Sequence, residues 1–155
     1  MSRIQNRLED LGLSLPQAPA PVAAYIPAVK TGNLIFISGQ VPFLDGELLA
    51  QGPIPSAVNL EQACAAARQC VLNGLAVLKD ALDGDLDRVN RFVKLGIFVY
   101  SDPDFTDQPK VGNGASELLQ EIFGESGRHA RAAVGSVALP LGSSVEVEMI
   151  VEVGG

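Results

Sequence analysis

The stretch RAAVGSVALP, residues 131–140, and the stretch VEVEMIVEV, residues 145–153, decide the fold and indicate the chemistry. In the second stretch apolar side chains alternate with glutamates, which predicts a strand with one buried face. In the first, Arg131 opens a segment that is otherwise apolar. Such an arginine must pair with an acid, cap a backbone group or bind a ligand. A carboxylate at the start of the antiparallel partner strand, or one across a subunit boundary, would complete a site for a small carboxylic acid and a water.

The composition predicts one globular domain that another subunit partly covers. The chain has 155 residues, of which 47% are apolar and only 19% charged, and its mean hydropathy is +0.24. This length suffices for a hydrophobic core, and such apolar character favours a covered surface patch. No window approaches the eighteen apolar residues of a membrane span. The first residues lack the apolar core of a secretory signal, so we expect a cytoplasmic protein without membrane association.

The charge balance argues against nucleic-acid binding. The chain carries eleven Lys and Arg against eighteen Asp and Glu, for a net charge of −7. Binding to phosphates relies on clustered cations, and the sequence contains no basic cluster. One histidine and two cysteines do not form a zinc motif. We therefore expect no nucleic-acid partner, no metal and no cofactor.

Periodicity and turn signals predict the order of the elements. A proline-rich link follows a short helix, and Asn59 is a predicted N-cap with Gln62 as its capping-box partner. Pro109 is predicted to open a later helix. The predicted elements are a helix over 2–12, strands over 25–30 and 34–38, a loop over 43–56, a helix over 59–82, a strand over 92–100, a helix over 109–124, and strands over 131–139 and 145–153.

The order ββαβαββ predicts an α+β domain with one mixed sheet and both long helices on one face. The other face then needs cover, and the short N-terminal helix is too small to supply it. Association of several copies into a closed ring is the simplest solution. We expect a homo-oligomer.

Three blocks of sequence resemble the RidA family, also called YjgF-like, and within it the chorismate-mutase-like branch. The resemblance spans residues 18–153 and leaves 1–17 as an N-terminal helical extension of a single domain. Together the blocks are more specific than any one of them. They are APAPVAAY at 18–25, GNLIFISGQVP at 32–42, and RAAV at 131–134 followed by LP at 139–140 and VEVE at 145–148.

The resemblance implies a homotrimer of chorismate-mutase-like subunits with sites in the clefts between them. It also implies hydrolysis of reactive 2-imino or enamine acids to 2-keto acids and ammonia. In this sequence Arg131 matches the arginine that binds the substrate carboxylate, and Glu146 matches the glutamate that positions water. No metal or cofactor takes part in that reaction, and the partner is a small carboxylic acid.

Four further residues match the substrate-binding part of the family pattern. Tyr25 matches the tyrosine at the mouth of the pocket, and Ser38 and Gly39 match the segment whose backbone lines it. Asn113 matches an asparagine that precedes the second long helix. Each has a structural alternative: Tyr25 as a residue packed on the sheet, Asn113 as a turn residue, and Glu146 as one acid of a solvated strand face.

Departures from the family pattern leave other functions open. The family's cysteine two places after the arginine is Ala133 here, and both the N-terminal helix and the 43–56 loop are additions. A non-catalytic trimer that binds small carboxylates is therefore the alternative to an imine deaminase. A chorismate-mutase-type rearrangement would need several cations around a dicarboxylate, and it ranks lower, as does ribonuclease activity.

Overall fold

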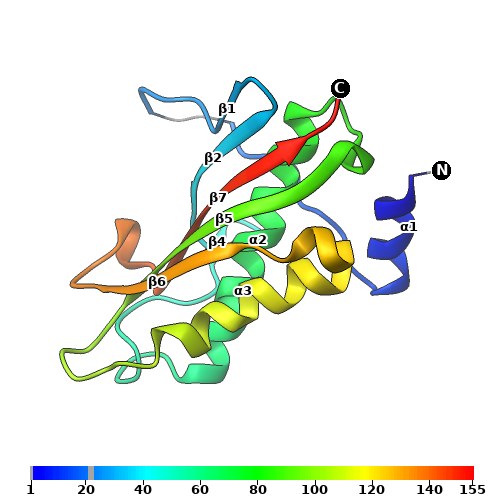
Figure 1. Ribbon diagram of the computed structural model, residues 1–155. Coiled ribbons are helices and arrows are strands. Elements are labelled where there is room, and N and C mark those ends of the chain that lie inside the picture. Colours follow the sequence, from blue (N-terminus) through cyan, green and yellow to red (C-terminus); the bar gives the residue numbers. More distant parts are fainter. Residues whose placement is uncertain (1, 21–22) are drawn as a thin grey trace.

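The computed structural model describes residues 2–20 and 23–155 and contains one main sheet covered on one face by helices (Figure 1). Its strands lie in the order β1-β2-β7-β5-β6. The helices are α1 (Arg3–Asp10), α2 (Leu60–Ala81) and α3 (Gln108–Phe123); the sheet strands are β1 (Ala28–Thr31), β2 (Leu34–Gln40), β5 (Val89–Tyr100), β6 (Ala130–Ser136) and β7 (Val145–Val153).

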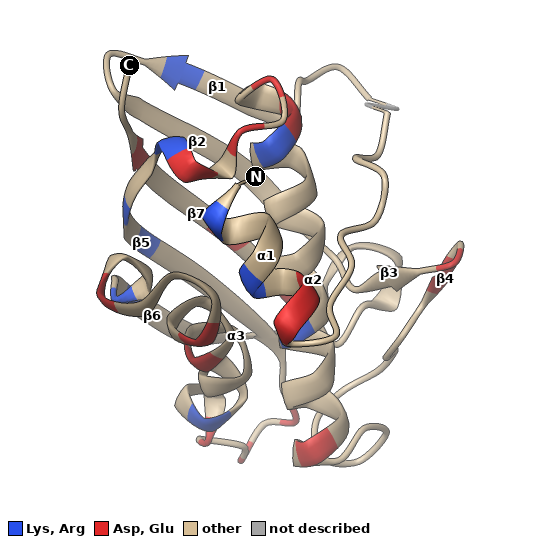
Figure 2. Cartoon of the chain, turned by 90° about the vertical axis from the view of Figure 1, so that its right-hand side faces the viewer, with Lys and Arg blue, Asp and Glu red and all other residues tan. Residues whose placement is uncertain are grey.

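The predicted fold class is confirmed. The sheet is mixed, because β6 pairs with β5 in parallel and the other pairs are antiparallel. Both long helices pack on the same face of the sheet, and Figure 2 shows them in front of the strands. The alternation of residues 145–153 is confirmed too: the apolar residues at every second position of β7, from Val145 to Val153, are buried in the core against the helices, whereas Ile150 lies on the other face.

The second long helix begins earlier than predicted. Pro109 is its second residue, not its first, and Asn113 lies inside α3, not before it. The predicted capping box of α2 is present: Gln62 N–H donates to Asn59 Oδ1 at 2.8 Å, and Asn59 N–H donates to Gln62 Oε1 at 3.0 Å. These reciprocal bonds satisfy two backbone donors at the start of the helix.

Two other predicted elements also differ. The first strand begins at Ala28, so Tyr25 lies in a bend before it. The predicted loop over 43–56 contains a small hairpin of β3 (Phe43–Leu44) and β4 (Glu47–Leu48). Its turn at Asp45-Gly46 has positive φ at both positions, the geometry of a tight two-residue turn.

The face of the sheet opposite the helices is uncovered in the single chain and carries exposed apolar side chains beside the glutamates of β7. Val29 pairs with Phe36, Phe36 with Ile150, and Ile150 with Lys94, which makes one row across four strands. Val29 and Phe36 are 49% and 42% exposed. The N-terminal helix α1 contacts α3 on the helix side and leaves this face free. That other copies of the chain cover this face stays a prediction, and these exposed apolar residues are what they would bury.

Candidate functional site

Arg131 lies on β6 at the edge of the sheet and points to the helix side. It pairs with Leu95 of β5, whose side chain is fully buried under the helices. Its Nη1 donates to Asn113 Oδ1 at 2.9 Å and to Ser116 Oγ at 3.1 Å, and its Nη2 donates to the carbonyl of Pro109 at 3.3 Å. We call Arg131, Asn113 and Ser116 the anion half-site.

The partners of Arg131 are all neutral. Among the described residues no carboxylate lies within ion-pair distance of its guanidinium. A guanidinium has five N–H donors, and the three bonds above leave Nε–H and one N–H of Nη2 without a protein acceptor in the described chain. Two such donors match the two oxygens of a carboxylate. The half-site therefore holds a fixed positive charge with its binding edge free.

Close packing of α3 against Arg131 explains the Gly-Asn-Gly sequence at 112–114. A Cβ on Gly112 would lie 3.2 Å from Arg131 Nη1, and a Cβ on Gly114 would collide with the backbone of Cys64 on α2. Glycine at both positions thus lets α3 approach β6 on one side and α2 on the other. Asn113 binds Arg131 from this turn of the helix, inside α3 and not before it. Its role in binding substrate stays a prediction.

Glu146 lies on β7 and points to the open face. It pairs with Phe98 of β5, whose neighbours Ile97 and Val99 face the helices. Its carboxylate contacts Gly39, where any Cβ would collide with it. Burial, and then the nearby carboxylate of Glu148, raise the pKa of Glu146. A half-buried carboxylate with a raised pKa is suited to accept a proton.

Ser38 and Gly39 form a bulge at the end of β2. Ile37 pairs with Met149 and Gln40 with Val147, so β2 has three steps where β7 has two. The extra residue bends the strand at this point. Such bulges are frequent beside binding sites, which agrees with the predicted role of this segment.

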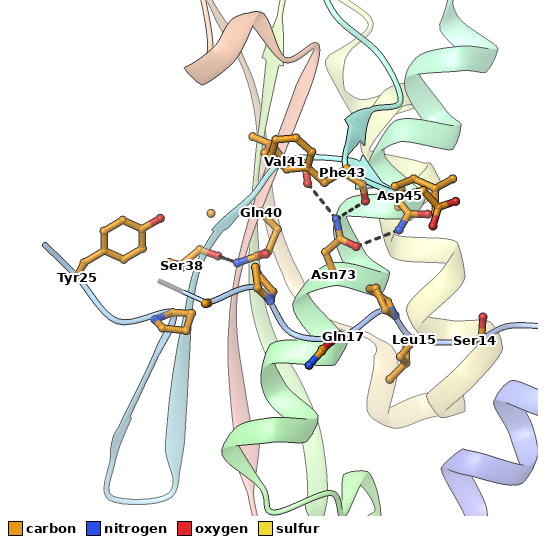
Figure 3. Close-up of a pocket in the computed structure, with 18 residues that line it drawn as sticks. Ser14, Leu15, Gln17, Tyr25, Ser38, Gln40, Val41, Phe43, Asp45 and Asn73 are labelled. Atoms are coloured by element: carbon orange, nitrogen blue, oxygen red, sulfur yellow. Dashed lines mark hydrogen bonds between the residues drawn. The ribbon is translucent and has the colours of Figure 1, made fainter. Parts of the chain in front are cut away.

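A cavity of about 560 Å³ opens beside the bulge. Tyr25, Ser38 and Gly39 line it together with the N-terminal link, β3 and α2 (Figure 3). Tyr25 is 57% exposed, in keeping with a residue at the rim and not with one packed on the sheet. Glu146 is not among the described residues that line this cavity, because it contacts Gly39 from the open face. We call Tyr25, Ser38 and Gly39, together with Glu146 on the other side of Gly39, the pocket half-site.

The structure corrects one sequence-based expectation about Arg131 and Glu146. Their strands are not partners, because β5 lies between β6 and β7. The two side chains also leave opposite faces of the sheet, one beside Leu95 and the other beside Phe98. Within one chain they cannot meet on a single small substrate. The sequence suggested two places for the carboxylate that faces Arg131: the partner strand or a neighbouring subunit. The strand order excludes the partner strand for Glu146 and leaves the neighbouring subunit.

Sequence reasoning missed several polar residues of the site. Ser116 lies one helical turn after Asn113, a spacing that puts both on one face of α3 and could have identified it. Gln69 and Asn73 are also one turn apart, on α2, in an otherwise apolar stretch. Two buried carboxamides at this spacing are a recognisable signal, since buried polar groups need partners.

No metal or membrane element is evident in the part of the chain that the structure describes. No group of three or more His, Cys, Asp or Glu residues there could hold a metal ion. None of the described helices is both long enough and apolar enough to cross a membrane.

The chain is similar to known proteins in sequence and in fold. Residues 5–153 match the family model "YjgF/chorismate_mutase-like, putative endoribonuclease". The crystal structure of the protein Atu1372 from Agrobacterium tumefaciens is similar with a TM-score of 0.92 and 45% identity, over 98% of this chain and 93% of that chain.

Two curated relatives are also similar over most of their length. Protein TCP17 of Trypanosoma cruzi is 45% identical, over 97% of this chain and 94% of its own. A 2-iminobutanoate/2-iminopropanoate deaminase of Dermatophagoides farinae is 29% identical, over 90% of this chain and 93% of its own. Because the family model covers residues 5–153, nearly the whole chain, the chain belongs to the YjgF/RidA family.

Proposed function

We propose that this protein is a cytoplasmic enzyme that hydrolyses 2-imino and enamine acids to 2-keto acids and ammonia. The observation that carries the proposal is the free edge of Arg131, a fixed cation with no carboxylate partner in the described chain. A small organic anion is the ligand that this geometry fits. The name of the deaminase relative from Dermatophagoides farinae supports the reaction.

The reaction needs one carboxylate and one water. Glu146 accepts a proton from the water as its oxygen bonds to the imine carbon, and the C=N electron pair moves to the protonated nitrogen. Glu146 returns this proton to the nitrogen of the resulting carbinolamine and accepts the hydroxyl proton, which it then gives to the released ammonia. The C–N bond then breaks with release of ammonia, and the C=O bond of the keto acid forms. The raised pKa of Glu146 suits a group that gains and returns a proton in this cycle.

The site is completed between two copies of the chain. Arg131 and Glu146 lie on opposite faces of one sheet, so one copy supplies the anion half-site and its neighbour supplies the pocket half-site. A closed ring of three, the assembly that the family resemblance implies, would repeat this contact three times. The uncovered apolar face with Val29 and Phe36 gives the copies a surface to bury.

Binding of a small carboxylate without turnover is the second candidate. It is favoured by one observation: the anion half-site is complete within a single chain, whereas Glu146 lies on the other face. A ribonuclease, as the family description names it, fits less well with a net charge of −7. A chorismate-type rearrangement also fits less well, because Arg131 is the one cation of the anion half-site.

The proposal is tested with an amino-acid oxidase that generates imines in place. Purified protein should speed the loss of imine. This loss is measured by trapping the imine that remains with semicarbazide at timed intervals. Arg131→Ala should lower kcat/KM by about a hundredfold, since charge-assisted hydrogen bonds contribute about 1.5–3 kcal/mol each. Arg128→Ala is the matched control, because Arg128 is exposed and contacts Glu125 at 3.5 Å.

Equal decay with and without protein, across several amino acids, would contradict the deaminase proposal. Thermal unfolding in the presence of 2-oxobutanoate then shows whether the protein binds small carboxylates without turning them over or does not bind them at all. A ligand that binds the folded state raises Tm by mass action. A rise that Arg131→Ala removes, without any turnover, would identify a binding protein.

A further inference from the structure

The cavity beside the bulge has a wall that the family resemblance does not assign. Its mouth contains Tyr25, Ser38 and Gly39, but its inner wall consists of side chains from α2 and the end of β2. The N-terminal link, residues 14–20, crosses in front of α2 and forms the outer wall of the cavity (Figure 3). A volume of about 560 Å³ lies within the range of small-molecule sites. An imine with only a methyl side chain would leave most of this space empty.

The hydrogen bonds of the inner wall fix how its carboxamides are oriented. Asn73 Nδ2 donates to the carbonyls of Val41 and Phe43, both at 3.0 Å. Carbonyls only accept, so this end of Asn73 must be its NH₂ group, and its Oδ1 faces Gln69. Gln69 therefore donates through Nε2, at 2.9 Å. Its own Oε1 is left without a protein donor among the described residues.

Gln40 is fixed in the same manner. Its Nε2 donates to the carbonyl of Ser38 at 3.1 Å, which leaves its Oε1 as an acceptor (Figure 3). Gln40 and Gln69 are only 7% and 8% exposed. Among the described side chains, the buried polar atoms that lack both a partner and access are on Arg88 and His129. The two glutamines line the cavity, and their oxygens have no protein donor among the described residues, so a donor on a molecule that fills the cavity can pair with them.

The charges of the cavity-lining residues indicate which kind of hydrogen-bond donor a ligand would present to these two oxygens. Of the described residues that line the cavity none is Lys or Arg, and the one charged side chain is Asp45, which is exposed on the β3–β4 turn. A second carboxylate on the substrate would find no cation here. A buried ammonium would lose its hydration against two neutral oxygens, which is costly. A neutral group with N–H donors meets the two oxygens at the lowest cost.

The geometry points to a side-chain pocket: this cavity receives the side chain of the imino acid and selects one that ends in a neutral N–H donor, such as a carboxamide. The inference rests on the proposed function for the reacting end of the substrate. Gln69 and Gln40 act as specificity residues. Gln69 accepts from the carboxamide nitrogen through Oε1, and Gln40 does so from the facing strand.

The N-terminal link is held in place for this role by helix α1. Asp87 Oδ2 accepts from Arg3 N–H at 2.7 Å, and its Oδ1 accepts from Ile4 N–H at 2.8 Å and from the Ser2 hydroxyl at 2.9 Å. Ile4 and Leu8 are 1% exposed. The link therefore starts from an anchored helix and forms a defined wall, not a loose cover.

The kinetic test uses two substrates of equal shape, the imines made from asparagine and from leucine. The wild-type protein should favour the asparagine imine in kcat/KM by about fivefold, since one net hydrogen bond contributes about 1 kcal/mol. Gln69→Leu should remove this preference and leave the alanine imine unaffected. Gln120→Leu, an exposed glutamine on α3, is the matched control.

A second variant guards against misfolding of the first, because Gln69→Leu also removes the donor to Asn73. Ala20 is exposed and lines the cavity, so Ala20→Phe fills it without disturbing the core. It should slow the asparagine and leucine imines by about tenfold and spare the alanine imine. Equal use of asparagine and leucine imines by the wild type, or an unchanged preference in Gln69→Leu, would overturn the inference.

A binding test separates the pocket from the reaction. Succinamate and 4-methylpentanoate are stable acids of equal shape, with and without the carboxamide, and their affinities are measured by calorimetry. Tighter binding of succinamate that Gln69→Leu abolishes supports the pocket even if no imine is turned over, in which case the deaminase proposal alone fails. Turnover of imines with equal affinity for the two acids overturns the pocket alone.

Discussion

Arg131 and Glu146 leave opposite faces of one sheet, from strands that β5 separates. Arg131 lies beside Leu95 under α3, and Glu146 lies beside Phe98 on the open face. Two strand spacings alone amount to about 10 Å. A single chain therefore contains two half-sites and not one site. Any reaction that uses both residues needs a second copy of the chain.

The contact between Gly39 and Glu146 predicts the effect of a single methyl group. Gly39 does not have positive φ, so alanine fits its backbone. The added Cβ would collide with the Glu146 carboxylate and push it aside. Gly39→Ala should lower kcat by about a hundredfold, because small misplacements of catalytic groups have effects of this size. Thermal unfolding should change little, since the displaced group is the end of a flexible side chain.

Gly154→Ala is the matched control for that substitution. A Cβ there would meet nothing closer than 3.4 Å. Full activity of Gly39→Ala would show that the position of Glu146 does not matter to the reaction.

Removing the charge of Glu148 is expected to shift the pH dependence of activity. Burial, followed by the charge of Glu148, raises the pKa of Glu146. Activity that needs ionised Glu146 falls as the pH drops through this raised value. Glu148→Gln removes the like charge, makes ionisation easier and should move the acid limb of kcat/KM to lower pH. A limb that stays in place, or moves to higher pH, would contradict the role of Glu146.

The control for the pH profile is Glu152→Gln. Glu152 lies further along the same strand and forms an ion pair with Arg91 at 3.0 Å. Its removal should leave the acid limb unchanged.

The hydrogen bonds of Asp87 to the start of α1 are expected to stabilise that helix. Burial acts to raise the pKa of Asp87, but hydrogen bonds from Ile4, Arg3 and Ser2 outweigh it and lower the pKa. Its contribution to folding is thus present above the ordinary carboxyl pKa and is lost as the pH falls through the lowered one. Asp87→Ala should destabilise α1 by about 1 kcal/mol, as the loss of a helix N-cap does.

Hydrogen exchange measures that change directly. Amides of α1 should exchange faster in Asp87→Ala, while those of α2 should keep their protection. Asp104→Ala, in an exposed turn, serves as the control. Unchanged exchange in α1 would show that Asp87 does not anchor the helix.

Local sequence patterns predicted the elements well and their pairing less well. The alternation in β7 and the capping box at Asn59 depend on neighbouring residues, so periodicity and spacing suffice to identify them. The place of β6 depends on the path of the chain through α3, which puts it in parallel beside β5. No pattern within residues 131–139 records that choice, so the side to which Arg131 points could not be read from it.

The residues of the candidate site likewise fall into those that local motifs identify and those that only the folded chain reveals. Family resemblance identified Arg131, Glu146 and the Ser38–Gly39 segment, because these lie in contiguous motifs. The Gln69–Asn73 pair and the cavity were missed, since they arise only when the N-terminal link packs across α2. Asn113 was identified, but its bond to Arg131 became visible only in the folded chain.

Mixing two inactive variants tests the shared site most directly. Arg131→Ala and Glu146→Gln should each have about a hundredth of the wild-type activity or less when alone. When the two are unfolded together and refolded as mixed oligomers, a boundary that joins an intact Arg131 to an intact Glu146 regains a complete site. Random pairing in a closed ring predicts recovery of about a quarter of the wild-type activity. Mixed oligomers that remain as inactive as their parents would contradict a site built from two copies of the chain.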